Sequence, residues 1–300
     1  MVFVAVLGSS TRMHEQALVA QAGVDVVAAP MPQSSGSSRR SVLDNRDIAG
    51  LVVGAGGEGW LEAVEESLDG GRRVLLLLPY LIDENTLDRL RRRDGKTPGL
   101  LSVSAPHCAE PVVRLARRSV REGQIGRARC VRILWTIDHE SPSYQPGDPL
   151  AWAGILADLG RAFLDDRPAR VAAVVQTTSG LVSLTLNVEG INGSLALLAG
   201  HGAYPSSPPL REIWVIGEKG AIHHRGDGGD LLWSEGRATT LAPPNDPVSL
   251  EVGAWLRAVA GGADEMTSIK QYSDAHAVAR AAIAALENGQ PVRIGHEAAR

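Results

Sequence analysis

Short, nearly continuous apolar runs separated by amphipathic stretches dominate the first third of the chain. The apolar runs cover residues 2–7, 24–29, 50–53, 74–78 and 100–104. Helical spacing of apolar positions falls between them, over residues 14–22, 60–68 and 83–93. Strands of this kind alternating with helices predict βαβ units, a parallel sheet covered on both faces and right-handed crossovers. Residues 31–41, rich in Pro, Ser and Gly, are expected to form a mobile loop.

The pattern changes after residue 104, where longer β-type runs cover residues 129–137, 170–177, 181–188, 193–199 and 212–217. Alternation of apolar and polar residues over 181–188 predicts antiparallel strands with one wetter face. Helices are expected over residues 111–122, 149–165, 249–260 and 273–287. The predicted fold is α/β. A Rossmann-type doubly wound parallel sheet spans residues 1–104. An α+β domain with a large, mostly antiparallel sheet spans residues 105–300, and its last helix is expected to pack back toward the first domain.

Composition excludes several classes of protein. The formal charge of -4 provides no broad positive field for nucleic acid or an anionic membrane. The apolar runs are too short to span a bilayer, and the apolar start is interpreted as a buried strand rather than a signal peptide. Cys108 and Cys130 form no CxxC pair, so neither a disulfide nor a zinc site is expected, and the predicted compartment is the cytoplasm. Arg91-Arg92-Arg93 is expected to be a solvated helix end.

Several motifs occur in a recognisable order. Gly-Gln-Ile-Gly stands at 123–126, Gly-Glu-Lys-Gly at 217–220, and the closing segment has Trp-Leu-Arg-Ala-Val at 255–259, Thr-Ser at 267–268, Ser-Asp-Ala at 273–275 and Gly-Gln-Pro-Val at 289–292. With these motifs the chain resembles the glucose–fructose oxidoreductase, inositol dehydrogenase and MocA family over nearly its whole length. The resemblance implies NAD(P), hydride transfer at a sugar or cyclitol carbon, and a homo-oligomer through the second sheet. These motifs are structural, so they support the fold more than the reaction.

The resemblance also implies a phosphate-binding turn and a ribose acid in the first domain. The turn would comprise Gly8, Ser9, Ser10, Thr11 and Arg12. It keeps only the first glycine of G-x-G-x-x-G. Hydroxyls, free amides and the arginine can hold a phosphate at a helix N-terminus; the alternative is a capped helix without ligand. No carboxylate follows the second strand, and Arg39 and Arg40 are either a 2′-phosphate site or a solvated basic pair.

The loop beside the nicotinamide would contain Gly54 and Gly56, with Glu58 and Trp60 as further contact candidates, or be only a flexible turn. The family's Glu-Lys-Pro motif keeps only Pro79, because leucine stands at the lysine position, Leu78. The remaining lysines, Lys96, Lys219 and Lys270, lie outside this motif.

The family's Asp and His pair, one helical turn apart, is reduced to Asp158, because Ala162 stands at the histidine position. Asp158 is either a remaining catalytic carboxylate or a structural one. A rearranged acid–base site would need His139, His107 or Tyr144, and His139 is preferred because it ends a predicted strand; the alternative is a surface histidine.

Loss of a general base costs roughly 10²–10⁴-fold in rate. The sequence therefore favours a family member that no longer performs ordinary hydride transfer. It would act as a non-catalytic or regulatory partner, possible partners including an active relative in a hetero-oligomer, or as a binder of a sugar-like ligand. In this interpretation NAD or NADP binding is doubtful and no metal is expected. The alternative is an active NAD(P)-dependent oxidoreductase with a rearranged site.

Overall fold

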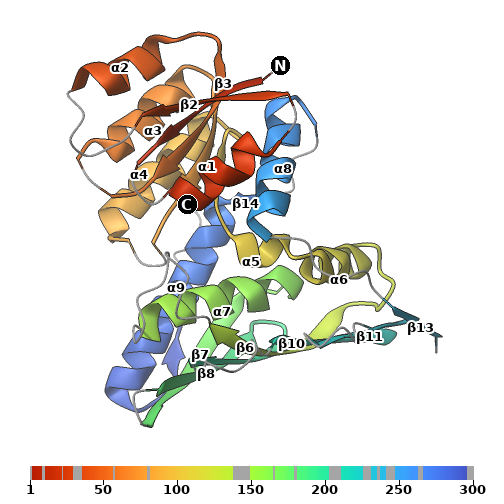
Figure 1. Ribbon diagram of the computed structural model, residues 1–300. Coiled ribbons are helices and arrows are strands. Elements are labelled where there is room, and N and C mark those ends of the chain that lie inside the picture. The colour runs from red at the N-terminus through yellow and green to blue at the C-terminus, as the bar shows by residue number, and fades with distance from the viewer. Residues whose placement is uncertain are drawn as a thin grey trace. The chain divides into compact units, whose positions relative to one another are not determined.

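A computed structural model describes residues 2–8, 11–21, 23–29, 36–56, 58–79, 82–137, 149–164, 166–178, 181–202, 211–225, 231–234, 237–240, 247–262 and 266–295 (Figure 1). The chain forms two compact units. The first unit comprises Met1–Ala109 and Asn245–Ser273, and the second comprises Glu110–Pro244 and Asp274–Arg300. None of the helices in the described ranges is long and apolar enough to cross a membrane.

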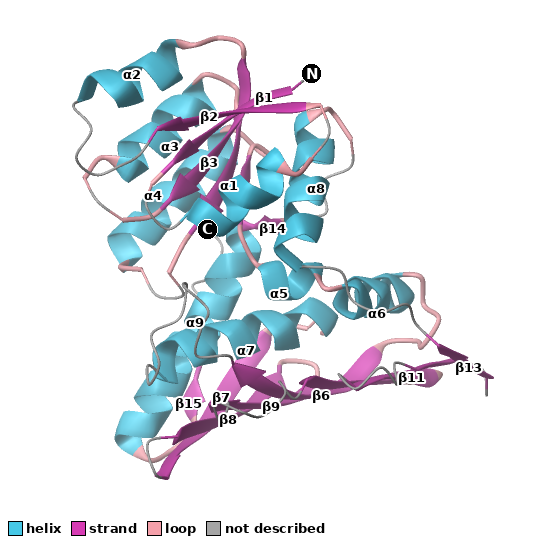
Figure 2. Ribbon diagram, viewed as in Figure 1, coloured by secondary structure: helices cyan, strands magenta, loops and turns pink. Residues whose placement is uncertain are grey.

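The sheet of the first unit has the strand order β14-β5-β4-β3-β1-β2. Its strands are β1 (Val2–Leu7), β2 (Val24–Ala29), β3 (Ile48–Gly54), β4 (Arg73–Leu77), β5 (Leu101–Val103) and β14 (Thr267–Ser268). Neighbours among β1 to β5 pair in parallel, whereas β14 runs antiparallel to β5. This arrangement confirms the predicted doubly wound parallel sheet (Figure 2).

Successive side chains of β1 enter two separate cores, because strand residues point alternately to opposite faces. Ala5 and Leu7 pack in one core with α2 (Gly36–Asp44), α3 (Trp60–Asp69) and α4 (Glu84–Lys96). Val4 and Val6 pack in the other core with α1 (Arg12–Val19) and α8 (Pro247–Val259). A short helix, α5 (Pro106–Ala109), follows β5. Helices therefore cover both faces, as the continuous apolar strands predict.

The predicted loop over residues 31–41 is wrong in its second half, where α2 begins at Gly36. Its composition is loop-like, but Val42 and Leu43 at the end of the helix are buried in the core beneath α2, α3 and α4. Burial of these two side chains outweighs the weak local preference of Gly and Ser for turns. Residues 31–35 lie outside the described ranges.

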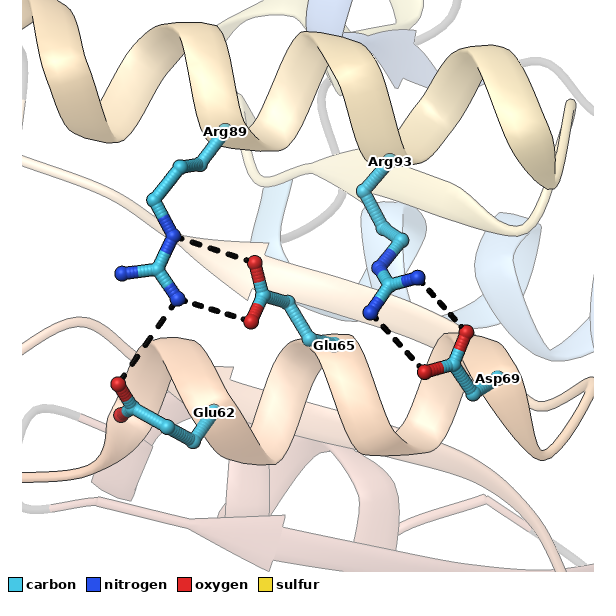
Figure 3. A network of polar contacts seen from close by, with 5 residues as sticks. All are labelled: Glu62, Glu65, Asp69, Arg89 and Arg93. Atoms are coloured by element: carbon cyan, nitrogen blue, oxygen red, sulfur yellow. Dashed lines mark hydrogen bonds and ion pairs between the residues drawn. The ribbon is translucent and has the colours of Figure 1, made fainter.

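Helices α3 and α4 are joined by ion pairs (Figure 3). Arg89 donates to both carboxylate oxygens of Glu65, at 3.2 and 2.8 Å, and Arg93 lies 2.8 Å from Asp69. Arg91 donates from Nε to the Ser273 hydroxyl at 2.9 Å. Arg91 and Arg92 are exposed, as the predicted solvated helix end requires, whereas Arg93 is partly buried in its contact with Asp69.

The second unit contains a sheet in the order β13-β12-β11-β10-β6-β9-β8-β7-β15. Its strands are β6 (Ala128–Ile137), β7 (Pro168–Thr178), β8 (Leu181–Gly190), β9 (Leu195–Gly202), β10 (Arg211–Gly217), β11 (Gly220–Arg225), β12 (Leu231–Ser234), β13 (Arg237–Thr240) and β15 (Val292–Arg293). β6 and β9 pair in parallel, and the other strand pairs in the described part of this sheet are antiparallel. The large, mostly antiparallel sheet is thus confirmed.

Helices α6 (Pro111–Arg121) and α7 (Pro149–Phe163) lie on one side of this sheet in Figure 2. The helix α9 (Ile269–Asn288) contributes Val278 to a small cavity on the same side, with Ala157 of α7 and Leu198 of β9. Alternate residues of β8 and β9 are buried beneath the helices, and the residues between them are more exposed. The predicted wetter face is the one that these helices leave uncovered.

Two of the glycine motifs found in the sequence pack against each other. The Lys219 amide donates to the Ile125 carbonyl at 2.9 Å, and a Cβ added at Gly217 would overlap that carbonyl oxygen. Gly126 has a φ of +69°, and its added Cβ would meet Glu218 at 3.1 Å. We call residues 123–126 and 217–220 the paired turns. Gly126 and Gly217 are therefore required by the packing of one turn on the other rather than by a ligand.

Candidate functional site

The strand order of the first unit places β1 between β2 and β3, so the crossovers from β1 leave in opposite directions. Open α/β sheets bind ligands at the carboxyl ends of strands at such a switch point. Gly8 follows β1 and Gly54 ends β3. Gly8 has a φ of +116°, and an added Cβ would lie 3.0 Å from the Gly54 carbonyl oxygen. We call the carboxyl ends of β1, β3 and β4 the switch-point edge.

The turn from β1 into α1 uses its threonine internally. The buried Thr11 hydroxyl donates to the Gly8 carbonyl at 2.7 Å, which closes the turn. Arg12 is exposed and makes no ion pair with any residue of the described ranges. Ser9 and Ser10 lie outside those ranges, so their proposed phosphate contacts stay predictions. Among the described residues of this turn, Arg12 is an exposed cation that can meet an anion.

A buried polar network lies directly behind this turn. His14 Nε2 is 3.0 Å from Glu251 Oε2 and 3.1 Å from Ser104 Oγ. The Ser104 hydroxyl donates to Glu251 Oε2 at 2.7 Å, and the Ala105 amide donates to Oε1 at 2.5 Å. Glu251 is 2% exposed. We call His14, Ser104 and Glu251 the His14 network; it ties α1, the end of β5 and α8 together.

The His14 network is structural in its geometry. The carboxylate accepts three hydrogen bonds, which is how a buried charge is normally satisfied. Both Ser104 and Glu251 meet the same imidazole nitrogen, so the ring is not oriented between a nucleophile and an acid. The sequence contains one signal of this network: Glu251 is the one acidic residue of α8, a mostly apolar helix.

No acid stands where a ribose would be bound. β2 ends at Ala29, and residues 30–35 contain no Asp or Glu. Arg40 lies 3.2 Å from both Asp44 and Glu66, so carboxylates of the same unit already neutralise its charge. The Arg39 side chain lies outside the described ranges. The segment of sequence that follows β2 therefore has no carboxylate that could hold the 2′-hydroxyl of a dinucleotide.

The loop after β3 is shaped by a backbone hydrogen bond and by a glycine with a positive φ. The Ala55 amide donates to the Leu77 carbonyl at 2.9 Å. Gly56 has a φ of +140°, and nothing lies within 4 Å of an added Cβ, so open space adjoins it. Trp60 packs against the core of the first unit, whereas Glu58 is exposed. Four residues of this loop were candidates for ligand contact: Gly54, Gly56, Glu58 and Trp60. Of these, Gly56 and Glu58 face space that a ligand can occupy.

At residue 78, where the family resemblance predicts a lysine, the side chain packs against the core. Leu78 is partly buried against the core formed with α2, α3 and α4. Pro79 is exposed. Its carbonyl oxygen accepts a hydrogen bond of 2.6 Å from the hydroxyl group of Tyr272, a buried residue. Tyr272 was not singled out in the sequence. A leucine at residue 78 cannot donate a hydrogen bond or carry charge.

In the second unit, Asp158 is buried on α7 and Ala162 is partly exposed one turn later. Gly160 between them packs closely on β9, since an added Cβ would lie 3.0 Å from Leu198 Cδ1. His107 is partly exposed on α5 of the first unit. His139 and Tyr144 lie outside the described ranges, so their proposed acid–base roles stay predictions.

A further charged group of the second unit was missed by sequence analysis. Arg211 Nη1 donates to Glu110 Oε1 at 2.6 Å, and the Arg211 guanidinium carbon lies 5.0 Å from the ring centroid of Trp135. Glu110 is 2% exposed. We call Arg211, Glu110 and Trp135 the Arg211 cluster. Glu110 and Arg211 are 101 residues apart, which left no local signal of their pairing.

The wetter face of the second sheet has its own ordered group. Trp214 and His223 stack with ring centroids 3.6 Å apart. The Trp214 indole N–H donates to Glu212 at 2.7 Å, and this bond is the main cause that lowers the pKa of Glu212.

The two free cysteines differ in environment: Cys108 is buried, and partial burial raises the pKa of Cys130.

Comparison with known proteins gives a consistent fold. No protein-family model matches the chain, and no curated protein matches it by sequence. A putative myo-inositol dehydrogenase from Sinorhizobium meliloti has a TM-score of 0.73 at 17% identity, over 98% of this chain and 100% of that one. Scyllo-inositol dehydrogenase from Lactobacillus casei, with bound NAD(H) and scyllo-inositol, has a TM-score of 0.74 at 14% identity, over 98% and 99%. Myo-inositol 2-dehydrogenase from Lactobacillus plantarum has a TM-score of 0.74 at 16% identity, over 98% and 100%.

Proposed function

We infer a function for this chain from its fold, which is the two-part fold of the inositol dehydrogenases. From that premise, we propose that it is a degenerate member of the glucose–fructose oxidoreductase, inositol dehydrogenase and MocA family. In this proposal the protein binds a sugar- or cyclitol-like small molecule in the cytoplasm and does not perform ordinary hydride transfer. The observation that carries the proposal is Leu78, which packs into the core at the position of the family's lysine. Ala162 likewise replaces the histidine.

The switch-point edge does not fit a nicotinamide dinucleotide in the family's manner. The end of β2 offers no carboxylate, and the Thr11 hydroxyl is used inside its own turn. Charge-assisted hydrogen bonds to a ribose are worth about 1.5–3 kcal/mol, so their loss weakens cofactor binding by roughly 10–100-fold. We therefore derive no reaction step through NAD or NADP, and no metal is part of the proposal.

The test is a titration of the purified chain, stripped of nucleotide, with NADH and NADPH by fluorescence and calorimetry. Oxidation of myo-inositol, scyllo-inositol and glucose is assayed in parallel. We expect no nucleotide binding below millimolar concentration and no turnover. Micromolar binding together with turnover of any of these substrates would overturn the proposal.

An active NAD(P)-dependent oxidoreductase on a sugar or cyclitol is the second candidate. It is favoured by the exposed Arg12 beside Gly8, which can meet a phosphate at the start of α1. Its acid–base group would be His139, His107 or Tyr144. If turnover is found, His139→Ala, His107→Ala and Tyr144→Phe separate these three sources, because the responsible residue is the one whose loss lowers kcat roughly 10²-fold or more.

We also propose that the wetter face of the second sheet joins two copies of this chain. Ile216 and Val174 are exposed on this face, and Leu195 and Leu197 of β9 are partly exposed. Apolar side chains on a face that no described helix covers are suited to an interface. Light scattering after size exclusion is expected to give a dimer or higher homo-oligomer, and a hetero-oligomer with an active relative is the alternative if the chain alone is monomeric.

A further inference from the structure

Two Asn-Gly pairs occur in the sequence, Asn192-Gly193 and Asn288-Gly289, and both lie in the second unit. Asparagine before glycine favours attack of the next backbone nitrogen on the side-chain amide, because glycine has no Cβ to obstruct the approach. The two pairs share this local chemistry but differ in the contacts that surround them. The tertiary structure therefore decides which pair is protected.

The first pair is held firmly in the turn between β8 and β9. Asn192 Nδ2 donates to Asp166 Oδ1 at 2.9 Å, and the Asn192 backbone N–H donates to Asp166 Oδ2 at 3.1 Å. The Gly193 nitrogen, which would be the nucleophile, donates to the Gly190 carbonyl oxygen at 3.1 Å. The side chain and the nucleophile of this pair are thus both engaged in hydrogen bonds that the reaction has to break.

The second pair lies at an open helix end. Asn288 is the last residue of α9, and both Asn288 and Gly289 are exposed. The Asn288 side chain makes no hydrogen bond with the residues that the structure describes. Gly289 has a φ of +65°, and nothing lies within 4 Å of an added Cβ. Because helix ends fray, the Asn288 side chain can rotate toward the Gly289 nitrogen.

A new negative charge at this helix end would have no local partner. The last turn of α9 contains no basic residue, and Glu287 directly precedes Asn288. A second carboxylate there would meet both the charge of Glu287 and the negative end of the helix dipole. β15 follows shortly after α9, and Val292 of β15 pairs with Val171 of β7. A disturbed end of α9 would therefore weaken the attachment of β15 to its sheet.

We propose that Asn288 is a deamidation site, and that its conversion loosens the end of α9 and the attachment of β15. The Gly289 nitrogen bonds to Cγ of Asn288, the bond from Cγ to the side-chain nitrogen breaks, and ammonia leaves with the proton of the Gly289 N–H. Water then opens the cyclic imide at either carbonyl and gives aspartate or isoaspartate. The net change is uptake of water and release of ammonia, without oxidation or reduction. The site lies outside the residues on which the proposed function rests.

The experiment is peptide mapping of the full chain by mass spectrometry during incubation at neutral pH and physiological temperature. Asn288 is expected to convert roughly 10–100-fold faster than Asn192, because the latter must first lose its hydrogen bonds to a carboxylate. The chain unfolded in urea is the reference, in which the two sites should convert at similar rates. If the folded chain protects Asn288 as strongly as Asn192, the inference is overturned.

Three variants test the physical basis of this selectivity, and a thermal melt of each confirms that it is folded. Asn288→Gln lengthens the side chain by a methylene and should abolish conversion at this position. Asp166→Ala frees Asn192, whose conversion should rise about 10-fold or more while that of Asn288 is unchanged. An unchanged rate at Asn192 would overturn the explanation by hydrogen bonding.

Asn288→Asp reproduces one product of the reaction. Hydrogen exchange of the β15 amides should become about 2–5-fold faster in this variant than in wild type, because the added charge opposes the helix dipole. Glu58→Gln, a charge change in the first unit, is the control and should leave β15 unchanged. Equal exchange in Asn288→Asp and wild type would overturn the proposed effect on β15.

Discussion

The paired turns of the second unit and the switch-point edge of the first unit differ in which residues they share with the family that the sequence resembles. In the paired turns, Gly126 and Gly217 are present, and each is required by a backbone contact. At the switch-point edge, Gly8 is present for a similar contact with Gly54, but a leucine packs at residue 78, where the family resemblance predicts a lysine. Under the function that we propose, positions that pack are kept and positions that react are replaced. This contrast separates what holds the fold from what performs a reaction.

The largest expected loss of stability comes from a substitution that separates the paired turns. Gly217→Ala places a Cβ where the Ile125 carbonyl lies, so one turn must move away from the other. We expect a loss of about 3 kcal/mol in the free energy of unfolding, at the upper end for overpacking. Urea denaturation measures it.

Gly95→Ala is the matched control for that substitution, because Gly95 is in α4 with nothing within 4 Å of an added Cβ. It should stabilise the protein by about 0.5–1 kcal/mol. Equal losses in both variants would mean that the close contact of the paired turns does not matter.

The second effect concerns the His14 network behind the switch-point edge. Glu251→Gln replaces one carboxylate oxygen by an N–H₂ group that cannot accept from Ser104, His14 or the Ala105 amide. We expect a loss of about 2 kcal/mol, typical of a buried donor left without an acceptor. Thermal and urea unfolding measure it.

Glu58→Gln, on the exposed loop before α3, is the control for Glu251→Gln and should change stability by less than about 0.5 kcal/mol. If Glu251→Gln is equally mild, the three hydrogen bonds do not hold α1, β5 and α8 together as described.

A third substitution restores chemistry to a position that now packs. Leu78→Lys puts an amine against the core of the first unit, and we expect a loss of about 1–2 kcal/mol. Ala162→His lies at a partly exposed position and should be nearly neutral. If Leu78→Lys is as mild as Ala162→His, then Leu78 has no packing role and the contrast between packing and reacting positions is weaker than stated.

The smallest effect is a pH dependence in the second unit. Burial acts to raise the pKa of Asp166, but hydrogen bonds from Ser194 and Asn192 outweigh it and hold the pKa below 3.8. A carboxyl group with a depressed pKa stabilises the folded state above its unfolded pKa, and this contribution is lost as pH falls through the folded pKa. Asp166→Ala should cost about 1 kcal/mol near neutral pH, because the group is partly exposed and water competes for its bonds.

Urea unfolding of wild type and Asp166→Ala across the acid range checks this prediction. The difference between the two proteins should shrink as pH falls below about 3.8. A difference that stays constant down to the lowest pH at which both fold would show that the charge of Asp166 contributes nothing.

The sequence by itself determined both sheets and the residues that could not do the expected chemistry. Continuous apolar runs predicted β1 to β5, and alternation predicted the wetter face of β8 and β9, because strand burial follows local periodicity. The absence of lysine at residue 78 and histidine at residue 162 needs no structure. Local composition failed at α2, where Val42 and Leu43 find a core that lies elsewhere in the chain.

Only the tertiary structure decided which polar groups meet. His14 and Glu251 are 237 residues apart, and Glu110 and Arg211 are 101 apart. A local pattern can show that a charged residue sits in an apolar stretch, but its partner depends on how distant elements pack. The roles of Gly8 and Gly217 were decided in the same way, since a glycine in a sequence does not reveal which backbone comes within contact distance of it.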